Sequence, residues 1–111
     1  MSQEKQCARM EFNDSEAKAA NQTRDQLLKL FAENLLAGCE PEHPSTQDLV
    51  ERYRREYIDI YLFPSTPIQI FGMGKAIAID PHNRRECEAY GAGMADYLSQ
   101  AMIAYYQNTK N

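Results

Sequence analysis

The histidines and cysteines are the residues best suited to catalysis or metal binding, and their spacing favours neither. His43 lies between two prolines and His82 follows an Asp-Pro pair, so both are expected in turns far apart along the chain. No carboxylates cluster with them at the spacing of a metal site. Cys7, Cys39 and Cys87 are odd in number and scattered, which is typical of free thiols in a reducing compartment. The sequence therefore predicts a cytoplasmic, non-enzymatic protein without metal or cofactor.

Aromatic side chains are the second group of residues that could have a function, namely ligand binding. The chain has seven tyrosines and four phenylalanines but no tryptophan. A tyrosine joins a broad apolar ring to a polar hydroxyl, which suits a groove for an amphipathic organic molecule. The alternative is that the rings form the core and place their hydroxyls at the surface. The rings concerned are Tyr53, Tyr57, Tyr61, Phe63, Phe71, Tyr90, Tyr97 and Tyr105.

Length and charge limit the classes of partner. The 111 residues suit a single domain, and 43% apolar with 25% charged residues is ordinary globular composition. A net charge of −4 argues against direct nucleic-acid binding, which needs a basic face. The basic cluster Arg52, Arg54 and Arg55 is flanked by Glu51 and Glu56, so we interpret it as a solvated helix face. No apolar run suits a membrane span or a secretory signal.

The first half of the chain predicts a leader and two helices. Residues 1–12 are polar and lack a clear period, and we expect a flexible leader there. A helix is predicted from the capping residues at 13–15 to Ala37, where Gly38 stops it in a left-handed conformation. After a linker with two prolines, Ser45 or Thr46 is expected to cap a second helix that ends at Pro64. Its apolar stripe comprises Leu49, Val50, Tyr53, Tyr57, Ile60 and Tyr61.

The second half predicts three more helices. Pro67 suits the first turn of a helix over residues 67–79, and a lone strand there would have no partner. The near absence of charge predicts a central, buried helix, with Gly72 and Gly74 permitting close helix contact. Asp80 is expected to cap a short helix in which Cys87 is a small buried hydrophobe. The last helix follows residues 91–93, with a stripe of Met94, Tyr97, Leu98, Ala101, Met102 and Tyr105.

Together these helices predict the fold class. About five helices joined by short loops bury their apolar stripes against one another. The expected fold is therefore an all-α, compact, globin-like bundle without haem. Residues 13–111 are predicted to form this single domain behind the leader.

Several short motifs follow one another in a fixed order from residue 37 to residue 102. The set consists of Ala37–Pro41, a helix beginning near Thr46, Gly74 followed six residues later by Asp80, and the segment Gly93–Met102. This set resembles the antibiotic-recognition domain of the thiostrepton-induced, TipA-type regulators of the MerR family. The resemblance runs from residue 41 to residue 105 without a gap.

The resemblance implies a globin-like domain that captures thiopeptides and other bulky hydrophobic antibiotics in a cleft of aromatic and aliphatic residues. It also implies an N-terminal part that orders on binding. The sequence departs from the family where Ile77 replaces an aromatic residue and His82-Asn83 replaces Arg-Phe. Gly72 stands where the founding regulator carries its thiopeptide-capturing cysteine, so covalent capture is not expected. The ~12 leading residues are too few for a winged helix-turn-helix.

Two functions follow as hypotheses. The first is a ligand-binding domain that senses or sequesters a hydrophobic, antibiotic-like small molecule, either as the effector domain of a regulator or standing alone. The second is a helical protein-interaction module that docks a partner protein through an exposed aromatic patch. The residues predicted to bind the small molecule are Tyr57, Tyr61, Phe71, Ile77, Tyr90 and Tyr97.

Overall fold

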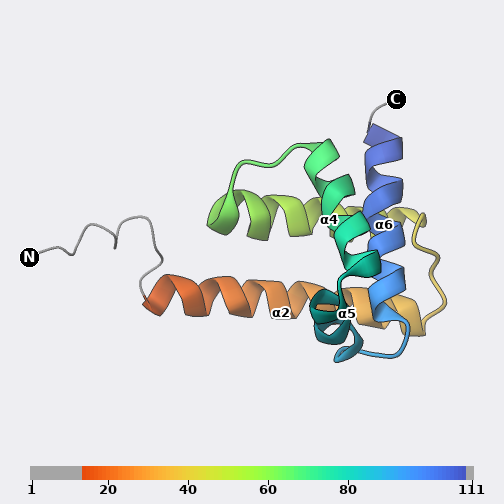
Figure 1. The fold of residues 1–111 in the computed structure, drawn as a ribbon, viewed down its shortest axis with the longest axis horizontal. Coiled ribbons are helices and arrows are strands. Elements are labelled where there is room, and N and C mark those ends of the chain that lie inside the picture. The colour runs from red at the N-terminus through yellow and green to blue at the C-terminus, as the bar shows by residue number, and fades with distance from the viewer. Residues whose placement is uncertain (1–13, 110–111) are drawn as a thin grey trace, which may run out of the picture.

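Helix α2 (Asp14–Leu36) begins the part of the chain that the computed structural model describes, residues 14–109 (Figure 1). Next come α3 (Pro44–Arg52) and, without a break, the π-helix η1 (Tyr53–Leu62). The chain then forms α4 (Pro67–Ile79), α5 (Pro81–Glu88) and α6 (Met94–Thr109). The described residues contain no strand, so the predicted all-α bundle of five helical segments is confirmed. The predicted leader lies outside the described residues.

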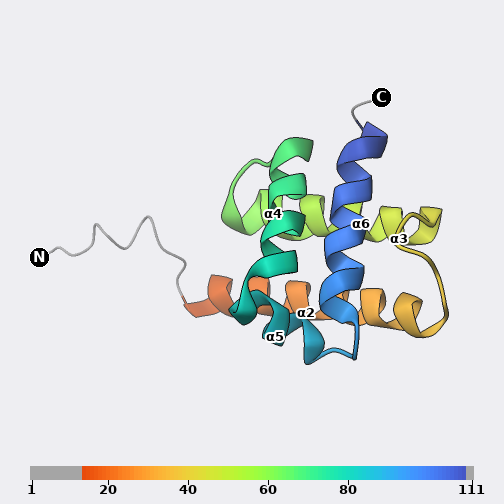
Figure 2. The same ribbon diagram turned by 45° about the vertical axis from the view of Figure 1, so that its right-hand side comes forward.

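The helices form two layers that cross each other. In one layer α2 lies beside the helix made of α3 and η1, as both views show (Figure 2). In the other layer α4 and α6 pack against each other, and α5 closes the end of this layer next to α2. No helix within residues 14–109 has both the length and the apolarity to cross a membrane.

The apolar stripe predicted for α6 is buried in the core. Each of its six members is at most 5% exposed: Met94, Tyr97, Leu98, Ala101, Met102 and Tyr105. Phe31 of α2, Val50 of α3 and Ile70 of α4 join the same cluster of buried side chains. Burial of one such side chain stabilises a fold by about 1.5–3 kcal/mol. Helices α3, α4 and α5 pack against α6, whereas η1 packs mainly against α2 and α3.

The stripe predicted for the second helix holds at Tyr53, which is buried, and at Tyr57, which packs partly buried against the core. It fails at Ile60, which is 65% exposed, whereas Ile58, outside the predicted stripe, is fully buried. The reason is the change to a π-helix, whose hydrogen bonds join residues five apart instead of four. Five residues after Tyr53 is Ile58, so the side that faces the core moves by one position.

The prediction that residues 67–79 form a central, fully buried helix is wrong in part. The segment is a helix and not a strand, as expected, but it is buried on one face only. Ile70, Gly74 and Ile77 face the core, while Ile79 at its end is exposed. Of the two glycines, only Gly74 allows a close helix contact, because the space around Gly72 is open. Low charge along a helix therefore does not by itself indicate full burial.

Helix ends follow the predicted signals with one exception. Gly38 has φ +82° and ends α2 in the left-handed conformation, and the Asp80 side chain accepts from the backbone N–H of Asn83 at 2.9 Å. At α3, however, the cap is neither Ser45 nor Thr46. His43 fills this place, since its Nδ1 accepts from the backbone N–H of Ser45 at 3.1 Å. Thr46 is instead buried in the core.

Candidate functional site

A cavity of about 200 Å³ lies where α2, η1, α4, α5 and α6 meet. Leu62 at one side is 47% exposed, whereas Leu98 is buried in the core, so the cavity reaches from the surface into the interior. Most of its lining is apolar or aromatic, as is usual for small-molecule sites. The lining residues are Arg24, Tyr53, Tyr57, Leu62, Met73, Ala76, Ile77, Asn83, Cys87 and Leu98.

The aromatic wall of the cavity follows from the π-helix. Tyr53 and Tyr57 stand on η1 with ring centroids 5.2 Å apart, and the ring of Tyr61 lies 6.4 Å beyond that of Tyr57. The three rings therefore form a row along η1, from the buried Tyr53 towards the surface. Helix α4 lines the same cavity with Met73, Ala76 and Ile77, of which Ala76 has the smallest side chain.

The polar groups of the cavity are few. Arg24 is the one charged residue among the described residues that line it, and its Nη2 donates to Glu86 Oε1 at 3.3 Å. Burial raises the pKa of Tyr53 to about 12, so its hydroxyl stays neutral near pH 7. Burial also raises the pKa of the Cys87 thiol, which keeps it protonated and a poor nucleophile. These groups can orient a bound molecule but give no nucleophile–base pair.

Three of the six residues predicted to bind a ligand come together here. Tyr57 and Ile77 line the cavity, and Tyr61 is the next ring in the row after Tyr57. Tyr90 lies on the other side of Arg24, where its hydroxyl donates to Asp25 Oδ1 at 2.6 Å.

The remaining two predicted residues lie elsewhere. Phe71 packs against Tyr106 of α6, with ring centroids 5.1 Å apart. Tyr97 is buried, and its hydroxyl donates to the backbone oxygen of Cys39 at 2.8 Å and lies 2.9 Å from Thr46 Oγ1. Its hydroxyl thereby joins the linker before α3 to α6.

Sequence reasoning missed Arg24, although a signal was present. Residues 20, 24, 27, 28 and 31 share one face of α2 at helical spacing, and all of them except Arg24 are buried apolar side chains. A charged residue on an apolar stripe is an exception that indicates a site. Leu62, Met73, Ala76 and Asn83 gave no such signal, because only the packing of η1, α4 and α5 brings them together.

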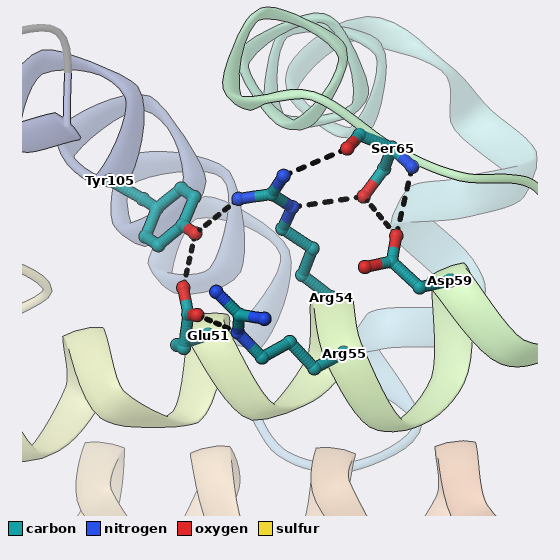
Figure 3. A network of polar contacts seen from close by, with 6 residues as sticks. All are labelled: Glu51, Arg54, Arg55, Asp59, Ser65 and Tyr105. Carbon is teal, nitrogen blue, oxygen red and sulfur yellow. Dashed lines mark hydrogen bonds and ion pairs between the residues drawn. The ribbon is translucent and has the colours of Figure 1, made fainter.

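A polar network holds the loop between η1 and α4 in place (Figure 3). This loop follows Leu62, which lines the cavity. Arg54 donates to Ser65 Oγ at 3.0 Å, to the Ser65 backbone oxygen at 2.8 Å and to the Tyr105 hydroxyl at 2.9 Å. Ser65 donates in turn to Asp59 Oδ1, through its hydroxyl at 2.6 Å and its backbone N–H at 2.8 Å. The Tyr105 hydroxyl donates to Glu51. The network thus joins η1, the loop and α6.

This network corrects the interpretation of the arginine cluster. Arg52 and Arg55 are exposed and form ion pairs with Glu56 and Glu51, as a solvated helix face does. Arg54 turns inward instead and makes three hydrogen bonds to Ser65 and Tyr105. The charge pattern could not distinguish it, because all three arginines have carboxylates near them in the sequence.

The comparisons with known proteins are consistent with a small-molecule cavity. A family model described as the TipAS antibiotic-recognition domain matches residues 2–105. No curated protein and no solved structure gives a significant match. The matched segment spans all the residues that line the cavity. The chain therefore belongs to the TipAS antibiotic-recognition domain family.

Proposed function

We propose that this protein binds a bulky, mainly apolar, antibiotic-like small molecule in the cavity beside η1, and that it does so without catalysis. The observation that carries the proposal is the cavity itself, which combines the aromatic row of η1 with apolar side chains of α4. Membership of an antibiotic-recognition family supports the same function. Among residues 14–109 there is no group of three His, Cys, Asp or Glu side chains that would hold a metal ion.

The cavity volume bears on how the ligand is held. Sites for drug-sized molecules measure about 300–1,000 Å³, whereas this cavity measures about 200 Å³. One or two rings of a bulky ligand therefore enter the cavity, and the rest covers the surface beside it. Exposed apolar side chains for that contact are present next to Leu62, at Ile60 and Phe63.

The cavity lining supports a ranking of the predicted ligand-binding residues. We propose that Tyr57, Tyr61 and Ile77 contact the part of the ligand that enters the cavity, together with Met73 and Leu62. Phe71, Tyr90 and Tyr97 then act indirectly, because each is engaged in a packing or hydrogen-bond contact away from the cavity.

The biological role that fits this proposal is sensing or sequestration of the molecule in the cytoplasm. The chain then acts either as the effector domain of a MerR-type regulator or alone, and contributes to drug resistance. It does not contact DNA directly, since its net charge is −4.

One observation favours the second candidate, a protein-interaction module. Four of the six large hydrophobic side chains that are most exposed within residues 14–109 fall between residues 60 and 68: Ile60, Leu62, Phe63 and Ile68. Only Phe63 among them is aromatic, whereas the protein-interaction hypothesis predicted an aromatic patch. Since Leu62 also lines the cavity, a bulky bound molecule would cover part of this surface as well. Ligand binding therefore accounts for both features and is the preferred function.

A thermal-shift panel tests the proposal. Thiopeptides, albicidin-like compounds and other bulky apolar antibiotics are added separately to the full chain at several concentrations. Binding to the folded state stabilises it by RT ln(1 + [L]/Kd), or about 2.7 kcal/mol at a hundred times Kd. We expect a concentration-dependent rise in Tm with one class of compound. A panel without any rise would contradict the proposal and favour the protein-interaction module.

A further inference from the structure

Arg24 occupies a position that an apolar side chain would normally fill. It stands on the core-facing stripe of α2 between Ala20 and Leu27, both of which are buried. Its own side chain is 28% exposed, and it forms part of the wall of an otherwise uncharged cavity. A charged group at such a place requires a partner, since burial of an unpaired charge is costly.

The contacts within the chain satisfy Arg24 only weakly. Its hydrogen bond to Glu86 measures 3.3 Å, longer than the 2.7–2.9 Å typical of charge-assisted bonds. Glu86 is 45% exposed and also pairs with His82 at 3.2 Å through its other oxygen. An exposed, shared carboxylate is a weak partner. The Tyr53 hydroxyl is a second hydrogen-bond partner of Arg24 at the cavity wall. A guanidinium carries five N–H donors in a planar fork, which exceeds what these two contacts use.

We infer that Arg24 binds an anionic group of the ligand, so that the molecules this cavity accepts are apolar ring compounds carrying a carboxylate or a similar oxyanion. The guanidinium fork matches the two oxygens of a carboxylate. An apolar cavity of about 150 Å³ holds benzene, and this one, at about 200 Å³, suits one or two rings beside that group. The inference rests on the proposed function, because it assigns the charge of a ligand at the same site.

The test compares two probes of the same shape. 1-Naphthoate carries the carboxylate, and 1-naphthamide replaces it with a neutral amide. Each is titrated into the full chain and the dissociation constant is measured by NMR chemical shifts. We expect naphthoate to bind roughly ten- to a hundredfold more tightly, the range of a hydrogen bond to a charged group. Arg24→Gln should abolish this difference, because naphthoate then loses far more affinity than naphthamide.

Two further variants separate a ligand contact from a structural role. Glu86→Gln removes the carboxylate that competes for Arg24, so naphthoate should bind several-fold more tightly than to the parent. A purely structural Arg24–Glu86 pair predicts no such gain. The matched control is Arg84→Gln, which removes an arginine paired with Asp96 at 2.9 Å outside the cavity lining. This control should leave both probes unchanged.

The outcomes distinguish this inference from the function on which it rests. Equal affinities for the two probes, unaltered by Arg24→Gln, overturn the inference and leave ligand binding intact. Failure of naphthoate to bind also overturns it, and the antibiotic panel then decides the proposed function separately. Preferential naphthoate binding that is lost in Arg24→Gln and raised in Glu86→Gln supports it.

Discussion

The hydroxyl of Ser99 donates a hydrogen bond of 2.7 Å to the backbone oxygen of Gly74, which joins α6 to α4 inside the core. The two helices approach so closely here that a side chain at position 74 does not fit. A Cβ atom on Gly74 would lie 2.9 Å from the backbone oxygen of Ser99 and 3.0 Å from Cβ of Met102. Because α4 also carries Ile77 and Ala76, this contact sets the position of one cavity wall.

Gly74→Ala is therefore expected to destabilise the protein. The new methyl group meets backbone and Cβ atoms that cannot turn away, and overpacking of this kind costs about 1–3 kcal/mol. Urea unfolding measures the change. The matched control is Gly72→Ala on the same helix, where nothing lies within 4 Å of the new Cβ. There alanine should stabilise by about 0.5–1 kcal/mol, because glycine is the poorer helix former. Equal effects of the two variants would contradict the close contact.

Ala76→Leu should block the cavity without harming the fold. The larger side chain occupies part of the cavity that Ala76 lines, and leucine is a good helix former. We expect a bound antibiotic to lose affinity roughly tenfold or more, about 1.4 kcal/mol. Calorimetry with the compound found by thermal shift measures it. Ala78→Leu, exposed on the same helix outside the cavity lining, is the control and should bind normally. Unchanged binding to Ala76→Leu would place the site elsewhere.

Arg54→Lys should loosen the loop between η1 and α4. Lysine keeps the charge but has no planar fork, so it cannot reproduce the three hydrogen bonds to Ser65 and Tyr105. A loss of about 1–3 kcal/mol in the free energy of unfolding is expected. Arg52→Lys serves as control, because its ion pair with Glu56 is exposed, and a change within about 0.5 kcal/mol is expected there. If Arg54→Lys leaves the free energy of unfolding unchanged, the network in Figure 3 does not stabilise the fold.

Glu88 should make the free energy of unfolding depend on pH in the acidic range. Its carboxylate accepts from the backbone N–H groups of Ala95 at 2.8 Å and Gly93 at 3.0 Å, and these bonds lower the pKa of Glu88. A depressed pKa means that this stabilisation is present above about pH 4.5, the ordinary glutamate value, and is lost as the pH falls through the folded-state pKa.

Glu88→Gln tests this pH dependence. Glutamine has one side-chain oxygen and no charge, so the variant should unfold at lower urea than the parent at pH 7. As the pH falls below about 4.5, the ordinary glutamate value, towards the lowered pKa of Glu88, the difference between the two proteins should shrink. Urea midpoints from pH 7 to pH 3 measure both. A difference that stays constant over this range would show that the charge of Glu88 does not contribute.

Local signals along the chain were enough to predict most helix ends. Gly38 ends α2 because it adopts φ +82°, and Asp80 caps α5 through its own side chain. Both effects involve residues within one turn of each other, so spacing reveals them. The cap of α6 was not predictable in this way, since Glu88 reaches across from α5 to Gly93 and Ala95.

The candidate site was predictable only in part. Aromatic content along the second helix led to Tyr57 and Tyr61, which do lie in one row beside the cavity. The same reasoning also selected Tyr97, because composition does not distinguish a ring that lines a cavity from one that forms the core. Arg24 was missed although it interrupts the apolar stripe of α2, and only the packing of α5 and η1 around it forms the cavity that it lines.

The sequence by itself determined the helical segments, their order and the core stripe of α6, because caps, breakers and 3.6-residue periodicity act between near neighbours in the chain. Only the tertiary structure decided that the second helix becomes a π-helix after Arg52, so that Ile58 faces the core and Ile60 the solvent. Only it decided which side chains enclose the cavity, because their meeting depends on how α2, η1, α4 and α5 pack against α6. Packing involves residues far apart in the sequence, and no local pattern records it.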